Sequence, residues 1–121
     1  MTAGNWQWNM EGQQSVARFA GNRLTLRCDP TARTIHIERR EPSASTQFSG
    51  SATLTVRTQS QTRVFAAIPQ GGAVTVSLAA RDPLLDAMAF TRGRFAVEAS
   101  GMPTLYVPSW TEVSRVIEDC R

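Results

Sequence analysis

The chain has 121 residues, carries a formal net charge of +3 at pH 7 and is 41% hydrophobic. This composition is typical of a globular protein and excludes a disordered chain, and the length predicts a single domain, 1–121. All thirteen basic residues are arginines, dispersed among ten acidic residues. Nucleic-acid-binding proteins gather positive charge into a stripe, so we expect no nucleic-acid partner.

No apolar run approaches the roughly 18 residues that a membrane-spanning helix needs, so we expect no transmembrane segment. The chain does not open with a basic segment followed by an apolar stretch. We therefore expect any export signal peptide to have been removed.

The clearest strands lie in the first third of the chain, where apolar and polar residues alternate. Trp6 and Trp8 share one face of a predicted first strand, and 15–20 fits a second. The next two, 23–28 and 33–38, are predicted to pair as a hairpin, because Asp29-Pro30 between them favours a tight turn.

A turn at 29–32 would set the register of this hairpin. It would place Leu26 opposite Ile35 and Leu24 opposite Ile37, with Arg23 facing Glu38.

The middle of the chain continues the β pattern. We expect an exposed loop over 41–50 and strands near 51–58, 62–68 and 73–78, with a glycine turn at 69–72. The segment TRVFAAI is apolar on both faces and cannot be oriented from its pattern.

Two helices are predicted in the last forty residues, around strands at 93–100 and 104–107. The helix over 83–91 has Asp82 as N-cap, proline at its first position and glycine beyond its end. For the helix over 110–120, Ser109 and Glu112 have the spacing of a capping box.

The two cysteines are expected on apolar faces. Cys28 continues the inward face of Leu24 and Leu26, and Cys120 ends the apolar stripe of the terminal helix. We predict a disulfide between Cys28 and Cys120 that tethers this helix, with two buried free thiols as the alternative. No second ligand pair and no CxxC motif accompany them, so we expect no metal site. A structural disulfide indicates an oxidising compartment.

The stretch from Ala80 to Arg121, with the early LTLRCD and NWQW segments, resembles small extracytoplasmic domains of alphaproteobacteria. The shared features are a cysteine-ending strand near the start, an LLDAM…RGRF helix–strand unit and a terminal helix ending in cysteine. The resemblance implies a periplasmic or lipid-anchored domain of the cell envelope and carries over no activity or cofactor.

Catalysis would have to rely on His36, the sole histidine, which falls on the polar face of a strand. None of the common hydrolase motifs surrounds a serine, so no catalytic residue is assigned and we expect no enzyme. Trp6, Trp8 and Tyr106 are candidate binding residues, because indole and phenol rings combine apolar area with a polar group. For the two tryptophans, core packing is the alternative.

These patterns together predict a mainly β, α+β fold. We expect an antiparallel β-sandwich or partly closed barrel of about seven or eight strands, with two short helices. The predicted function is a non-catalytic envelope module that binds a protein or polysaccharide partner, without a cofactor. The alternatives are a small periplasmic enzyme centred on His36 and a periplasmic inhibitor of a lytic enzyme.

Overall fold

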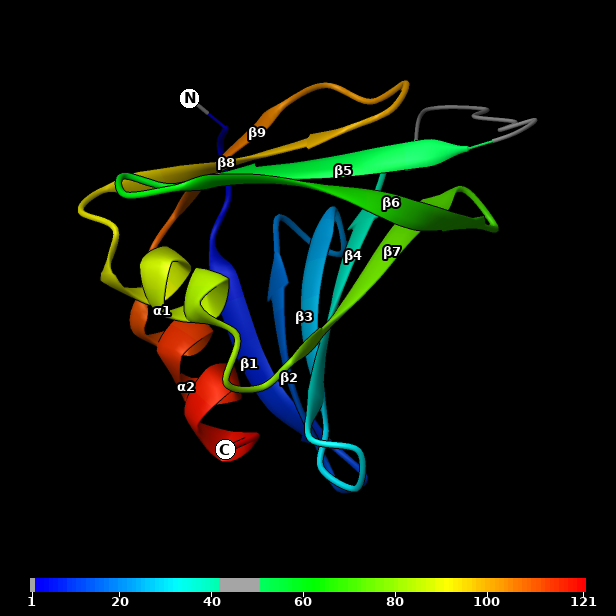
Figure 1. Cartoon of the computed structure of the whole chain (residues 1–121). Helices are drawn as coiled ribbons and strands as arrows, with labels where there is room; N and C mark the ends of the chain where they lie inside the picture. Colours follow the sequence, from blue (N-terminus) through cyan, green and yellow to red (C-terminus); the bar gives the residue numbers. More distant parts are fainter. Residues whose placement is uncertain (1, 42–50) are drawn as a thin grey trace.

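The computed structural model describes residues 2–41 and 51–121. Nine strands form one open antiparallel sheet in the order β1-β2-β3-β4-β7-β6-β5-β8-β9 (Figure 1). Their bounds are β1 Trp6–Glu11, β2 Gln14–Phe19, β3 Leu24–Asp29, β4 Thr34–Arg40, β5 Ala52–Arg57, β6 Thr62–Gln70, β7 Ala73–Ala79, β8 Arg94–Ala99 and β9 Leu105–Pro108. Except for Glu41, the loop predicted over 41–50 lies outside the residues that the structure describes.

The mainly β, α+β class is confirmed, but the single open sheet differs from the predicted sandwich or barrel. The sheet bends sharply at β6, whose first six residues pair with β5 and whose last three pair with β7. In Figure 1, β5, β6, β8 and β9 form an upper layer, and β1 to β4 with β7 run steeply below it. Because one strand belongs to both layers, the core is enclosed by one folded sheet.

The hairpin of β3 and β4 forms with a register two residues away from the predicted one. Leu26 lies opposite Ile37 and Cys28 opposite Ile35. The turn has the predicted four residues but lies one residue later, because Asp29 still pairs with Thr34 in the ladder. The Asp29 carboxylate accepts the backbone N–H groups of Thr31 and Ala32, and Arg33 takes a left-handed conformation with φ of 53°. A shift by two preserves the side-chain alternation, so the predicted inward face is correct.

Two helices lie against the sheet, α1 over Pro83–Phe90 and α2 over Thr111–Asp119. The apolar stripe of α2 packs on β2 and β3 through Val113, Val116 and Ile117, all buried. The predicted disulfide is present: Cys120, just after α2, is joined to Cys28 on β3 with the Cα atoms 5.5 Å apart. The bond closes a sequence separation of 92 residues and holds the terminal helix on the sheet.

The N-terminus of α2 differs from the prediction. Trp110 is its N-cap, and no side chain caps the helix. Instead, the hydroxyl of Ser109 donates to the carbonyl oxygens of Met88 and Ala89, at 2.6 and 3.0 Å. These carbonyls lie in the last turn of α1 and lack intrahelical partners, so Ser109 stabilises the neighbouring helix.

Candidate functional site

Trp6 is an internal contact in this fold. Its side chain is only 4% exposed, and its ring packs 5.5 Å from that of Phe19. The indole N–H donates to the carbonyl oxygen of Pro108 at 2.7 Å, which joins the first strand to the end of the last one. Trp6 therefore closes the fold and offers no ring surface to a partner.

Trp8 holds α2 against the sheet. The Arg115 guanidinium lies 3.8 Å from the centre of the Trp8 ring, and the indole N–H donates to the Ser15 hydroxyl at 2.8 Å. Ser15 in turn donates to Asp119 at 2.7 Å, and Asp119 pairs with Arg115 at 3.5 Å. One face of the Trp8 ring is thus covered by Arg115, which leaves little room for the predicted stacking on a sugar.

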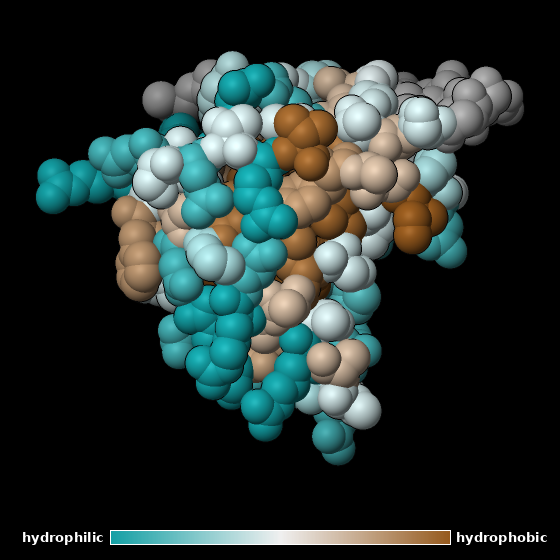
Figure 2. All heavy atoms as spheres, viewed as in Figure 1, coloured by the Kyte–Doolittle hydropathy of each residue, from teal (hydrophilic) through white to brown (hydrophobic). Residues whose placement is uncertain are grey.

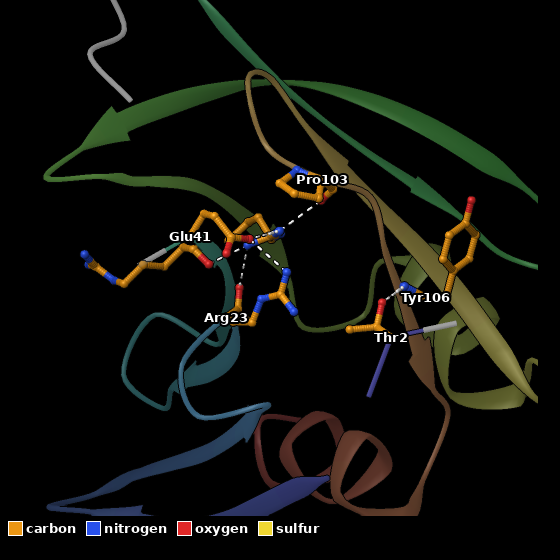
Figure 3. A network of polar contacts seen from close by, with 7 residues as sticks. Thr2, Arg23, Glu41, Pro103 and Tyr106 are labelled. Carbon is orange, nitrogen blue, oxygen red and sulfur yellow. Dashed lines mark hydrogen bonds and ion pairs between the residues drawn. The ribbon is translucent and has the colours of Figure 1, made fainter. Parts of the chain in front are cut away.

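Tyr106 is exposed on β9. Its backbone N–H donates to the hydroxyl of Thr2 at 2.9 Å, so the N-terminal segment runs beside this strand (Figures 1 and 3). The three aromatic candidates therefore do not share one surface, because Trp6 is buried, Trp8 is partly covered by Arg115 and Tyr106 is exposed on β9.

His36 lies on the polar outer face of β4. Its Nδ1 atom is 2.6 Å from the hydroxyl of Ser77 on β7, and Arg27 is its cross-strand neighbour on β3. Among the described residues no carboxylate hydrogen-bonds the ring, so the Ser77–His36 pair lacks the third group that orients the base in a catalytic triad.

A buried ionic network lies where β3 begins and β4 ends (Figure 3). Arg39 points from β4 toward the core and is 0% exposed; it donates to Glu41 at 2.8 Å and to the Pro103 carbonyl at 2.9 Å. Arg23 donates to the same Glu41 oxygen at 2.9 Å. The hydrogen bond from Arg39 is the main cause that lowers the pKa of Glu41 below its ordinary value. The network ties the β8–β9 loop to the ends of β3 and β4.

The most unusual feature is the edge of β6. Over Thr62–Ala67 this strand pairs with β5 alone, and no other described strand pairs with its opposite edge. β7 pairs with β6 only as far as Thr75 and then follows β4, so the two strands diverge. We call this unpaired side of Thr62–Ala67 the β6 edge.

The two hairpins that flank β6 show which backbone groups lie at the β6 edge. In the β5–β6 hairpin the Thr58 N–H bonds to the Gln61 carbonyl at 2.8 Å. In the β6–β7 hairpin, Gly71-Gly72 form a two-residue turn with positive φ angles. Counting from either turn, hydrogen-bonded and non-hydrogen-bonded pairs alternate along the ladder. Both counts place the N–H and C=O groups of alternate residues at the β6 edge: Thr62, Val64 and Ala66.

The side chains along this edge are apolar and well exposed. Val64 is 66% and Ile68 69% exposed on the outer face, and Phe65 is only half-buried on the inner one. Figure 2 shows hydrophobic side chains gathered on the side of the molecule where β6 and β7 diverge. Free strand edges are commonly protected by charges or proline, yet Val64–Ile68 contains neither, and the neighbouring Arg63 is paired with Asp82 at 2.6 Å.

A groove of about 370 Å³ continues from the start of the β6 edge. It lies between the β5–β6 turn, residues 59–61, and α1. Phe90 lines it and is 77% exposed, the highest value among the large hydrophobic residues described. The apolar surface at the β6 edge therefore extends past Thr62 along the side of α1.

Comparisons with protein-family models, with curated proteins and with solved structures find no match to this chain. The resemblance to extracytoplasmic domains thus stays a prediction. No described helix has the length and apolar character needed to cross a membrane.

Proposed function

We propose that this chain is a non-catalytic binding module that takes up an extended segment of a partner protein as an added strand on β6. The observation that supports this most directly is the β6 edge. Its unpaired N–H and C=O groups are spaced for another β-strand, and strand addition is a common mode of peptide recognition.

The side chains near the β6 edge define the chemistry of the partner segment. Phe65, Ala67, Val76 and Leu78 face the interior where β6 and β7 part, so the added strand should carry apolar residues at alternate positions. Within Thr62–Ala67 the one charged residue is Arg63, which is already paired with Asp82. A mainly uncharged segment fits this surface better than an acidic one, and better than a polysaccharide, which lacks backbone amides.

We further propose that the protein works outside the cytoplasm, in the periplasm or attached to the cell envelope. The support is the disulfide between Cys28 and Cys120, because structural disulfides persist in oxidising compartments. A segment-binding module in the envelope is compatible with the alternative role of an inhibitor that docks on a lytic enzyme.

Short random peptides displayed on phage and selected on the oxidised chain provide the probe for this function. We expect selected peptides to alternate apolar residues and to bind Val64→Pro about fivefold more weakly, because proline removes an N–H from the β6 edge and hydrogen bonds contribute about 1 kcal/mol each. Val64→Thr is the matched control, since it changes the same side chain and keeps the N–H.

The peptide affinities should be measured by fluorescence anisotropy on variants whose melting temperatures match the wild type. Equal affinity of Val64→Pro and Val64→Thr would show that the peptide does not pair with β6. A library that gives no binder of the oxidised chain would also count against the proposed function.

A further inference from the structure

A second cavity lies on another part of the molecule, where β7 ends. It has a volume of about 190 Å³. Its lining combines three arginines with small apolar groups: Arg33, Ala79, Ala80, Arg81, Cys120 and Arg121. The arginines come from three separate segments, the β3–β4 turn, the β7–α1 connection and the residue after the disulfide. The Ala80 N–H donates to the Arg33 carbonyl at 2.9 Å, which fixes the first two segments together.

The charges around this cavity are unbalanced. Arg121 pairs with Asp86 at 2.8 Å. Asp82, which follows Arg81 in the sequence, pairs with Arg63 and not with an arginine of the cavity. The exposed side chains of Arg33 and Arg81 have no ion pair or hydrogen bond within the described ranges. The cavity therefore carries an excess of positive charge that an anion would neutralise.

Arg121 is held in a fixed position at the wall of this cavity. Arg121 is held by its Nε atom, which donates to the Ala80 carbonyl at 2.8 Å, and by the pair that its Nη1 atom makes with Asp86. Its Nη2 atom is buried and has no hydrogen-bond partner among the described residues. Because this atom has almost no accessible surface, it is not open to a ligand in the cavity, and Arg121 contributes to the site through its fixed positive charge.

The β3–β4 turn determines where Arg33 lies. With φ at 53°, Arg33 holds a left-handed conformation that glycine or asparagine adopts at lower cost. Because the Arg33 carbonyl accepts the Ala80 N–H, this turn holds Arg33 beside the cavity.

We propose that this cavity binds a small organic carboxylate with a short apolar tail. Guanidinium groups match the planar carboxylate through paired N–H donors. The methyl groups of Ala79 and Ala80 and the Cys120 sulfur give the remaining wall an apolar character that suits the tail and disfavours a fully hydrated anion such as phosphate. The site is independent of the β6 edge.

The probe is sodium propionate, titrated into the oxidised, isotope-labelled chain at constant ionic strength and followed by amide NMR shifts. We expect saturable shifts at Ala79 and Ala80, and a Kd that rises at least about tenfold in Arg33→Gln and in Arg81→Gln. The control is Arg92→Gln, which alters an exposed arginine beyond the opposite end of α1 and should leave the Kd unchanged.

Two peptides ending in alanine, one with a free and one with an amidated C-terminus, separate the possible sources of the carboxylate. Tighter binding of the free-carboxylate peptide than of propionate assigns the site to a protein C-terminus, and equal binding assigns it to a free acid. Absence of saturable shifts, an equal effect of Arg92→Gln, or binding of inorganic phosphate as tight as that of propionate would overturn the proposal.

Discussion

Reduction of the Cys28–Cys120 disulfide is expected to lower the free energy of unfolding by about 4 kcal/mol. The bond closes a sequence separation of 92 residues, and cross-links over loops of this length restrict the unfolded chain most strongly. Urea denaturation of the oxidised and fully reduced wild-type chain measures the difference. The double variant Cys28→Ala/Cys120→Ala is the control, because reductant should change its stability no further.

The loss should be felt first at the C-terminus. Without the bond, α2 is held by its apolar stripe and by the Trp8–Arg115 contact, so limited proteolysis should cleave within Thr111–Asp119 before it cleaves the sheet. A stability difference below about 1 kcal/mol would mean that α2 docks without help from the disulfide.

Glu41→Gln is expected to lower the free energy of unfolding by about 3 kcal/mol at neutral pH. Glu41 compensates the charge of Arg39, which is fully buried, and a buried charge that loses its partner costs roughly 3–5 kcal/mol. Because folding lowers the pKa of Glu41, this stabilisation is present above about pH 4.5 and is lost as the pH falls through the folded-state pKa.

The matched control for this variant is Glu38→Gln, three residues earlier on β4. Glu38 pairs with Arg40 at 3.5 Å on the exposed face, where ion pairs contribute less than about 1 kcal/mol. Chemical denaturation at pH 7 compares the two variants. Equal losses for Glu41→Gln and Glu38→Gln would contradict the structural importance of the buried network.

The strands, the helices and the disulfide could be predicted because they depend on local periodicity. Alternation in 23–28 and 33–38 identified the inward faces, and the helical stripe identified Cys120 as buried. The hairpin register could not be predicted in the same way. It depends on the residue at which the turn begins, and the left-handed backbone at Arg33 has no signal in an arginine.

The features that the sequence left undecided, or predicted wrongly, are those that depend on distant partners. Ser109 has the spacing of a capping residue, yet its hydroxyl bonds to α1 because the two helices meet there. Trp6 and Trp8 were placed correctly on one face of β1, but their partners, Pro108 and Arg115, lie about a hundred residues away in sequence. An aromatic pair on a strand therefore did not distinguish a binding surface from internal packing.

The sequence of β6 shows an apolar pattern that did not predict its unpaired edge. TRVFAAI is apolar on both faces, which is typical of a strand covered on both sides. In the structure neither face of β6 is fully covered, and one edge is unpaired over the described strands. This combination is compatible with the strand addition that we propose at the β6 edge.

Amide hydrogen exchange of the free, oxidised chain tests the β6 edge most directly. The amides of Thr62, Val64 and Ala66 should exchange at least about tenfold faster than those of Arg63, Phe65 and Ala67, which bond to β5. Adding a selected peptide should slow the first set and leave the second unchanged. Uniform slow exchange of all six amides in the free chain would show that the edge is already paired and would contradict strand addition on β6.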